Sequence, residues 1–374
     1  MHGGDLIWEI GSGYFGCRTA DGRFDPERFA VQAQNPQVRM IEIKMSQGAK
    51  PGHGGILPKH KVTQEIADTR GILMGEDCIS PSRHSAFSTP IELMHFIQQL
   101  RELSGGKPVG FKFCLGHPWE FMGIAKAMLE TGILPDFIVV DGKEGGTGAA
   151  PVEFTDHIGV PLREGLLFVH NTLVGLNLRD KIKLGASGKI VSAFDIASVL
   201  AIGADWANSA RGFMFAIGCI QSQSCHTNKC PTGVATQDAL RQRALVVPDK
   251  AQRVYNFHRN TLKALAEMLA AAGLAGIADS DELHGIVVMI RVDIRPGCDG
   301  YGDSNPMKQD MQTLIAKLSS GSDSSDTSGI SAEMEACERV LASAGAALGR
   351  GEIIRHRRDS RGRWGGAAWC RPRG

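Results

Sequence analysis

The stretch FIVVDGKEGGTGAAP, residues 137–151, joins a short apolar run to a loop that contains four glycines. A nearly continuous apolar run such as FIVVD is typical of a strand that is buried on both faces of a parallel sheet. The glycines after it let backbone amides approach a flat or anionic ligand closely, although a tight turn has the same composition. The stretch therefore predicts a parallel α/β fold with a candidate ligand loop at the carboxyl end of a strand.

The same alternation of apolar strand, glycine-bearing loop and helix recurs on both sides of that stretch. We predict strands at residues 40–45, 109–115, 181–184 and 205–208, and helices at residues 90–103, 119–131, 166–177 and 192–202. Such alternation favours a (β/α)8 barrel or a doubly wound sheet, and both place ligands at the carboxyl ends of strands. The first 13 residues read as a glycine-rich loop, and the predicted strands are too few for a closed barrel of eight.

The composition limits the classes of protein. A chain of 374 residues with 43% hydrophobic residues can bury a large core, and its formal net charge of +1 gives no overall field for nucleic acid or an anionic membrane. The apolar runs are too short to span a bilayer, and the start lacks the pattern of a secretory signal. Nine cysteines argue against a disulfide framework and for a reducing compartment. We therefore expect a cytoplasmic protein without a membrane segment or a nucleic-acid partner.

We divide the chain into three parts. Residues 1–275 carry the strand and helix alternation, and residues 276–318 form a poorly assigned extension. Residues 319–374 comprise the flexible linker SSGSDSSDTSG, an alanine-rich helix to about residue 348 and an Arg/Gly/Trp tail. This tail has too few apolar residues to fold alone, so we expect disorder or divergent sequence, with RNA binding as the lesser alternative.

Three cysteines, Cys219, Cys225 and Cys230, lie close together in the stretch CIQSQSCHTNKCPTG, residues 219–233. Thiolates in a short loop suit iron–sulfur ligation, and three rather than four favour a [3Fe-4S] cluster. Zinc held with His226 is the first alternative, but His226 adjoins Cys225 and the spacing is wider than zinc motifs prefer. Three unligated thiols are the remaining alternative.

Several basic residues lie where a barrel would bind its ligand. Lys44 and Lys112 alternate with apolar neighbours near predicted strand ends, so each points away from the core-facing side chains. A lysine there can stabilise negative charge on a reduced flavin or pair with a carboxylate, and a solvated or paired lysine is the alternative. Lys50 is a loop lysine with the same alternative.

Two further glycine-bearing loops follow the last two predicted strands. GASGK, residues 185–189, precedes a predicted helix, so its amides and Lys189 can hold a phosphate at a helix N-terminus. NSARG, residues 208–212, adds Arg211. Because loops in these positions bind phosphate in many βα barrels, we predict a phosphate site there.

Five blocks of the chain carry a family resemblance: MIEIKMSQGAKPGHGGILPKHKV (40–62), ISPSRHSAFSTPIEL (79–93), VDGKEGGTGAAP (140–151), EGLLFVHNTL (164–173) and CIQSQSCHTNKCPTGVATQ (219–237). In order and spacing they resemble the FMN-binding synthase domain of glutamate synthase, and more closely the stand-alone FMN-binding glutamate synthase family proteins. The resemblance runs from about residue 2 to about residue 273. It implies a (β/α)8 TIM barrel, apart from a first strand expected upstream of Met1, with FMN and a [3Fe-4S] cluster as cofactors.

The implied reaction is that of an oxidoreductase acting on CH–NH2 donors: reduction of 2-iminoglutarate, formed from 2-oxoglutarate and ammonia, to glutamate. The residues that match the family's substrate and catalytic positions are Lys44, Gln47, Lys50 and Arg70. The residues that match its flavin and phosphate positions are Lys112, Gly145, Gly146, Thr147, Gly148, Gly188, Lys189, Arg211 and Gly212. Cys219, Cys225 and Cys230 match its cluster ligands.

The chain departs from the family pattern at several positions. Ile56 stands where glutamate synthases have a substrate-binding glutamine, and ASG, residues 186–188, replaces the DGG of the large enzymes. An amidotransferase domain is not recognised, so we expect free ammonia or a separate amidotransferase subunit, and a ferredoxin or NADPH-linked reductase as electron donor. Two alternatives stay open: a different glutamate-related substrate, as in methylamine–glutamate metabolism, and a truncated non-catalytic homologue.

Overall fold

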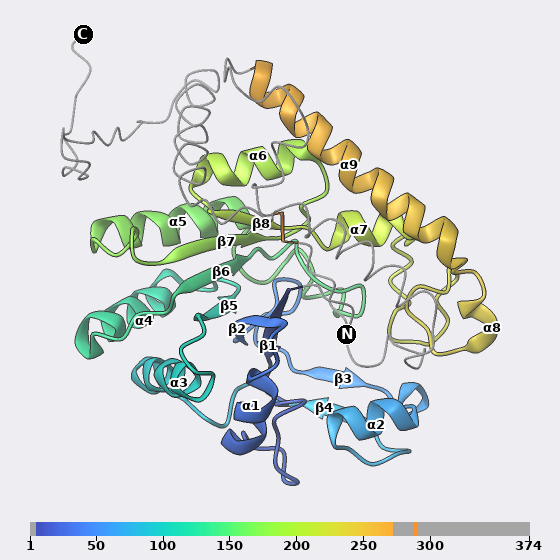
Figure 1. Ribbon diagram of the computed structural model, residues 1–374, viewed down its shortest axis with the longest axis horizontal. Helices are drawn as coiled ribbons and strands as arrows, with labels where there is room; N and C mark the ends of the chain where they lie inside the picture. Colours follow the sequence, from blue (N-terminus) through green and yellow to red (C-terminus); the bar gives the residue numbers. More distant parts are fainter. Residues whose placement is uncertain (1–4, 272–287, 290–374) are drawn as a thin grey trace.

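The computed structural model describes residues 5–271 and 288–289 (Figure 1). Apart from the strand at residues 288–289, the predicted extension, linker, helix and tail at residues 276–374 lie outside the described residues. The fold below is that of the described part of the chain.

Seven parallel strands form one sheet in the order β1-β2-β5-β6-β7-β8-β9. The strands are β1 (Leu6–Ile10), β2 (Val38–Lys44), β5 (Val109–Phe113), β6 (Phe137–Asp141), β7 (Lys183–Ser187), β8 (Trp206–Asn208) and β9 (Val288–Met289). Each strand pairs with the next sheet strand along the chain, so the order never reverses as it does in a doubly wound sheet. The α/β barrel prediction is confirmed, in the form of a curled half-barrel.

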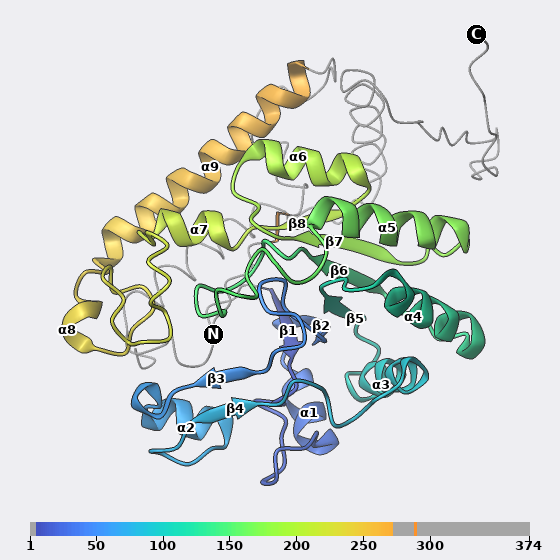
Figure 2. The ribbon, with the colours of Figure 1, turned by 180° about the vertical axis from the view of Figure 1, so that it is seen from behind.

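Helices cover the outer face of this sheet. They are α1 (Pro26–Ala33), α3 (Pro90–Leu103), α4 (Pro118–Thr131), α5 (Leu162–Gly175) and α6 (Ala193–Ile202), and Figure 1 shows α3 to α6 fanned along one side of the strands. The view from behind gives the same arrangement (Figure 2). Side chains on the outer face of the strands, including Ile41, Phe111 and Val140, are buried against these helices in one core. This packing is the main stabilisation of the fold, because it removes the most apolar surface from water.

Local sequence signals explain where these helices begin. Thr89 and Glu92 form a reciprocal capping box before α3, and Pro90 occupies the first helical turn, where its missing N–H is not needed. Ser192 and Asp195 form the same box at α6. The first turn of α5 is capped from elsewhere in the chain, since the Glu144 carboxylate accepts the Leu162 N–H at 3.0 Å.

A small lobe follows β2. It contains β3 (Gly55–Leu57), the 3-10 helix η1 (Lys59–Lys61), α2 (Gln64–Arg70) and β4 (Cys78–Ser80), and β3 pairs with β4 in antiparallel fashion. Both views place this lobe beside α1, at one end of the molecule (Figures 1 and 2). Its own apolar cluster contains Val62, Ile66, Ala67 and Cys78.

Three helices follow β8: α7 (Arg211–Ala216), α8 (Ala239–Gln242) and the long α9 (Val247–Ala271). The buried residues of α9, which include Val254, Leu262 and Leu269, recur on one face, and this face packs against α6 and α7. The three clustered cysteines lie in the loop between α7 and α8. Within the described residues, no helix combines the length and the apolar character needed to cross a membrane.

The secondary structure corrects the sequence prediction in several places, and α1, α2, α7, α8, β3 and β4 were not predicted. β1 lies within the stretch that was predicted as a loop, and the predicted strand 181–184 is displaced, because β7 runs through Ser187. The predicted helix 166–177 begins four residues earlier, at Leu162, and α9 was not predicted. The strand at 137–141 and the helix at 90–103 are confirmed with the predicted bounds.

Candidate active site

The concave face of the sheet has an apolar half toward the amino ends of the strands. Phe137, Val139 and Trp206 form a buried cluster there, and Ile7 and Met40 pack against it. Glycines make room for the large rings: a Cβ at position 185 would lie 2.6 Å from the Trp206 indole. Apolar side chains fill this half of the face, so its role is to stabilise the fold.

The carboxyl half of the same face is charged. Glu9, Glu42, Lys44, Lys112 and Asp141 come from four adjacent strands, and strand alternation points them all to the concave side. We call these five residues the charged cluster. It contains three carboxylates and two ammonium groups, so its formal charge is negative when every member is ionised.

Ion pairs connect the members of the charged cluster. The Glu9 carboxylate bridges both lysines, with one oxygen 3.0 Å from Lys44 Nζ and the other 2.5 Å from Lys112 Nζ. Lys112 also pairs with Glu42 at 3.5 Å. Lys112 and Glu42 are almost fully buried, whereas the side chains of Lys44 and Glu9 are 27% and 22% exposed. The outer pair is therefore the part of the cluster that solvent or a ligand reaches.

Burial raises the pKa of both Glu42 and Asp141 above the usual range of carboxyl groups, and the nearby Lys112 charge offsets part of that rise. Asp141 also accepts the Gly48 N–H at 2.8 Å, which ties the end of β6 to the loop after β2. These two carboxyls hold a proton more tightly than exposed carboxyls do.

The loops after β2 and β6 pack against each other without room for side chains. A Cβ at position 48 would lie 1.9 Å from the Gly142 carbonyl oxygen, and one at position 146 would lie 2.5 Å from Ala49 Cβ. Gly146 also has φ +123°, a value that side-chain-bearing residues rarely adopt. The glycines of the predicted ligand loop are therefore required by a close approach of two backbones.

The loops after β7 and β8 join the same assembly. A Cβ at position 145 would lie 2.8 Å from Gly188 Cα, and Arg211 donates to the Gly146 carbonyl oxygen at 2.7 Å. Gly212 packs on the Phe257 ring of α9, where a Cβ would lie 2.7 Å from the ring. The structure thus brings together the four strand-end loops that the sequence singled out.

The cysteine loop reaches this assembly at one point. A Cβ at position 148 would lie 2.9 Å from Cys225 Sγ, so the end of the β6 loop lies directly against that sulfur. From the small lobe, the buried ammonium of Lys61 donates to the carbonyl oxygens of Cys225 and Ala235, at 2.9 and 3.2 Å. Three segments that are far apart in sequence therefore meet around Cys225.

Cys225 is affected electrostatically by the other two thiols of the loop. Burial raises the pKa of Cys225, and charge on Cys219 and on Cys230 raises it further. At Cys230, burial is outweighed by hydrogen bonds from the Thr232 hydroxyl and nearby backbone amides, which lower the pKa of that thiol. Among the residues that the structure describes, no three His, Cys, Asp or Glu side chains converge on a single metal ion. An iron–sulfur cluster does not require its ligands to converge on one ion, because each of its cysteines binds a different iron atom.

Three of the remaining predicted residues make contacts within their own segments. Arg70 is buried in the small lobe, where its guanidinium lies 4.6 Å from the Phe15 ring centre and 3.4 Å from Cys78 Sγ. Lys50 donates to the Gly54 carbonyl oxygen at 3.1 Å, and the Thr147 hydroxyl accepts the Ala149 N–H at 3.1 Å. Both therefore stabilise their own loops.

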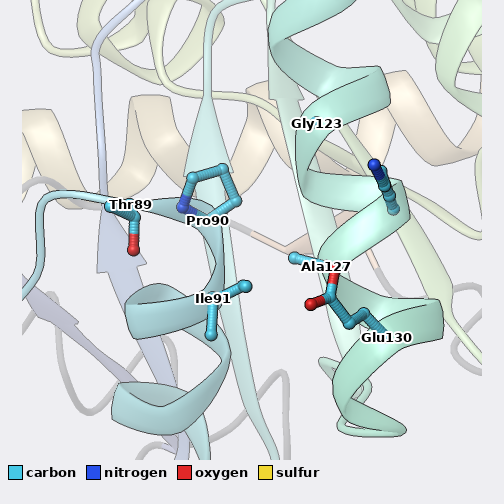
Figure 3. A pocket seen from close by; sticks show the side chains of 7 residues that line it. Thr89, Pro90, Ile91, Gly123, Ala127 and Glu130 are labelled. Atoms are coloured by element: carbon cyan, nitrogen blue, oxygen red, sulfur yellow. The ribbon is translucent and has the colours of Figure 1, made fainter.

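Two pockets of similar size differ in their position. One, of about 220 Å³, lies at the predicted phosphate loop, and its lining includes Gly188, Lys189 and Arg163. Lys189 pairs there with Asp156 at 3.0 Å. The other, of about 190 Å³, lies between α3 and α4 on the outer helical layer (Figure 3). Only the first pocket adjoins the strand-end loops.

The residues present fit a flavin. Glycine-rich backbone surrounds the strand ends, and Lys44 and Lys112 supply cations beside it. Arg163 and Lys189 line the pocket at the predicted phosphate loop, together with Glu144 and Asp195. Within the described part of the chain, two buried acceptors in this region, Gln47 Oε1 and Asn208 Oδ1, have no hydrogen-bond donor. Buried acceptors of this kind are normally satisfied, and a bound ligand satisfies them.

Sequence reasoning missed four residues of this region: Glu9, Glu42, Lys61 and Asp141. Glu9 and Glu42 alternate with apolar residues, in LIWEI and MIEIK, and this alternation was a signal for a charged concave face. Asp141 ended a correctly predicted strand. Nothing local marked Lys61, because its partners are more than 160 residues away along the chain.

Comparison with known proteins agrees with the sequence resemblance. The chain is 43% identical to the glutamate synthase large subunit-like protein YerD of Bacillus subtilis, over 73% of this chain and 51% of that protein. It is 34% identical to the archaeal glutamate synthase (NADPH) of Methanocaldococcus jannaschii, over 75% of this chain and 53% of that protein. The chain thus spans about half the length of the curated relatives it matches.

Similarity to solved structures is weaker. A mutant flavocytochrome b2 with pyruvate bound aligns with a TM-score of 0.35 and 14% identity, over 58% of this chain and 45% of that one, which supports no inference. The family model described as the conserved region in glutamate synthase matches residues 2–275, well over half of the chain. The chain belongs to the glutamate synthase family.

Proposed function

We propose that this chain is the flavin-binding part of a glutamate synthase-type oxidoreductase, in which FMN and a [3Fe-4S] cluster serve the reduction of 2-iminoglutarate to glutamate. One observation supports this most strongly: the loop after β6, which the flavin would contact, lies against Cys225 of the cysteine loop. A flavin and an electron carrier must lie close together if electrons are to pass between them. The 2-iminoglutarate forms from 2-oxoglutarate and ammonia.

When bound, FMN supplies the hydride for the imine carbon, and the cluster supplies electrons one at a time. The chain's own residues bind the flavin and the substrate and orient them. Lys44 is the partly exposed cation of the charged cluster, so it is suited to hold a substrate carboxylate. Lys112 is buried below it and fixes positive charge where a reduced flavin develops negative charge.

Loop residues complete the binding site. Gln47 has a buried side-chain oxygen without a donor in the described structure, and it lies on the loop that Lys50 stabilises, between the flavin and substrate positions. Gly145, Gly146, Thr147 and Gly148 supply backbone to the flavin, and Gly188, Lys189, Arg211 and Gly212 bind its phosphate. Arg70 is assigned to the substrate site by its match to the family position alone, and its contacts in the structure are to Phe15 and Cys78.

Cys219, Cys225 and Cys230 hold the cluster in this proposal. The hydrogen bonds that stabilise the Cys230 thiolate suit thiolate ligation. Lys61 fixes the backbone of the same loop through two carbonyl oxygens. No reaction step is assigned to these residues beyond holding the loop and its sulfurs in place.

The partners of the reaction are also proposals, because the chain covers only part of its relatives. Archaeal and archaeal-type relatives carry NADPH in their names, which suggests an NADPH-linked reductase as electron donor here, and a ferredoxin is the other candidate. Free ammonia or a separate amidotransferase subunit supplies the nitrogen. We place this reaction in the cytoplasm.

A labelling experiment tests the proposed reaction. The full chain, loaded with FMN and iron, is incubated with 2-oxoglutarate, 15N-ammonium and a chemical reductant, and labelled glutamate is measured. We expect glutamate to form only when FMN is bound. Parallel incubation with methylammonium detects N-methylglutamate and thus a methylamine-type reaction. Absence of any labelled amino acid, with both cofactors at full occupancy, would contradict the proposal.

A further inference from the structure

Glu9 contacts both lysines on which the proposed site depends. One carboxylate oxygen lies 3.0 Å from Lys44 Nζ, and the other lies 2.5 Å from Lys112 Nζ. Glu9 thus occupies the kind of position at the two ammonium groups that an anionic group of a ligand would take. This residue was not among the predicted site residues, because β1 itself was not predicted.

The two ion pairs of Glu9 differ in environment. Lys112 is 2% exposed and has Glu42 as a second carboxylate partner, whereas the Lys44 side chain is 27% exposed. Partly exposed ion pairs are weak, because solvent screens them. The Glu9–Lys44 pair can therefore exchange with a ligand while the Lys112 pairs stay intact.

The other groups around Lys44 do not replace Glu9 as a controlling charge. Glu42 and Asp141 interact electrostatically with both lysines and are buried, and Glu42 lies 3.5 Å from the Lys112 ammonium. The His84 Nε2–H donates to the Lys44 backbone oxygen at 2.8 Å, and burial lowers the pKa of His84, which favours the neutral imidazole at pH 7. Glu9 is the carboxylate in direct contact with the Lys44 ammonium.

From this geometry we propose that Glu9 is an internal counter-ion that a carboxylate ligand must displace from Lys44, and that it thereby sets the affinity of the site for such ligands. The inference rests on the proposed function, because it takes Lys44 as the substrate cation. It adds that the Glu9 carboxylate opposes a second anion at Lys44 until it turns away from that ammonium, while its contact with Lys112 stays in place.

The test is a binding measurement with glutarate, a dicarboxylate that lacks a reactive carbonyl. The full chain loaded with FMN is titrated by calorimetry at pH 8 and low ionic strength, with wild type, Glu9→Gln and Glu9→Asp compared. Glu9→Gln keeps the shape and removes the charge, and we expect it to bind glutarate about tenfold more tightly. Glu9→Asp keeps the charge, so its affinity should stay close to that of wild type.

A salt series separates displacement of a charge from a merely structural effect. Salt screens the Glu9–ligand repulsion, so the advantage of Glu9→Gln should shrink as ionic strength rises from about 0.01 to 0.5 M. The exposed Glu102→Gln substitution on α3 serves as control and should leave affinity unchanged.

The outcomes distinguish failure of the inference about Glu9 from failure of the proposed function. If wild type binds glutarate and Glu9→Gln binds it equally or more weakly, Glu9 orients Lys44 rather than competing for it, and the inference is overturned. If neither wild type nor Glu9→Gln binds, both the inference and the dicarboxylate substrate class are overturned. Binding by Glu9→Gln alone supports the inference in its strongest form.

Discussion

The two halves of the concave face are built from the same strands and have opposite chemistry. Toward the amino ends, the Phe137 and Trp206 rings pack 5.7 Å apart, and glycine at position 185 leaves space for the indole. Toward the carboxyl ends, Lys112 and Glu42 are buried as an ion pair beside Asp141.

Burying apolar rings stabilises the fold, whereas burying charges removes them from water and costs free energy that pairing only partly offsets. A fold under selection for stability alone would not retain three carboxylates and two lysines in that place. The difference separates a half that holds the sheet together from a half that is available for binding. Substitutions should therefore affect either stability or function, depending on the half in which they lie.

The largest effect is expected in the cysteine loop, which meets the loop after β6 beyond the carboxyl half of the concave face. Cys225→Ser should abolish incorporation of iron, because a hydroxyl is a poor ligand for the soft iron of a cluster. Iron and sulfide content of the purified protein measure this. Cys17→Ala, at a buried thiol whose pKa burial raises to about 12, is the control and should keep the full iron content. A full iron complement in Cys225→Ser would refute the ligand assignment.

Next in size is the loss of the exposed cation of the charged cluster. Lys44→Ala should weaken 2-oxo acid binding by about 10- to 100-fold, the range expected for a charged hydrogen bond, and should affect FMN binding far less. Titration with each ligand measures both affinities. Lys126→Ala, at an exposed position on α4, is the matched control. Equal loss of both affinities in Lys44→Ala would argue against its substrate role.

Substitutions in the apolar half of the concave face should change the stability of the fold instead. Gly185→Ala places a Cβ 2.6 Å from the Trp206 indole, and we expect the free energy of unfolding to fall by about 1–3 kcal/mol. Urea denaturation measures the change. Gly175→Ala, where a Cβ meets no atom within 4 Å, should leave stability within about 0.5 kcal/mol of wild type. If Gly185→Ala left stability unchanged but lowered ligand affinity, the division between the halves would be wrong.

The smallest effect concerns the pH dependence of stability. Because burial raises the pKa of Asp141, the folded state binds more protons than the unfolded state between the two pKa values. Wild-type stability should therefore fall as pH rises from about 4 toward the raised value, by about 1.4 kcal/mol for each unit that the pKa is raised.

Asp141→Asn removes that titration and can still accept the Gly48 N–H through its amide oxygen. Its stability relative to wild type should therefore increase as pH rises through this window. Thermal denaturation from pH 4 to pH 8 measures the difference. A difference that stays constant across this range would show that Asp141 does not titrate with a raised pKa.

The sequence predicted the elements whose signals are local. The strand at residues 137–141 is apolar throughout, and the helix at residues 90–103 carries its own capping box, so both are confirmed with the expected bounds. The strand near residue 183 was ended too early, because Gly185 reads as a turn residue. It stays in the strand, since the Trp206 indole occupies the space beside it.

Elements that depend on distant partners were not predicted. β1 requires pairing with β2, and the start of α5 requires the Glu144 carboxylate from another loop. In the same way, the ligand loops were recognised by their glycines, but the contact of Gly148 with Cys225 exists only in the folded chain. Composition indicates which loops can bind a ligand, and tertiary packing decides which of them meet.

The central claim is that the glycine loop after β6 and the cysteine loop form one site for a flavin beside a cluster. The most direct test measures FMN and iron together in purified wild type and in Gly148→Ala, whose Cβ would lie 2.9 Å from Cys225 Sγ. The account predicts FMN and about three iron atoms per wild-type chain, and loss of iron with weakened FMN binding in the folded variant. Wild type that folds with neither cofactor, or a variant that keeps both in full, would contradict it.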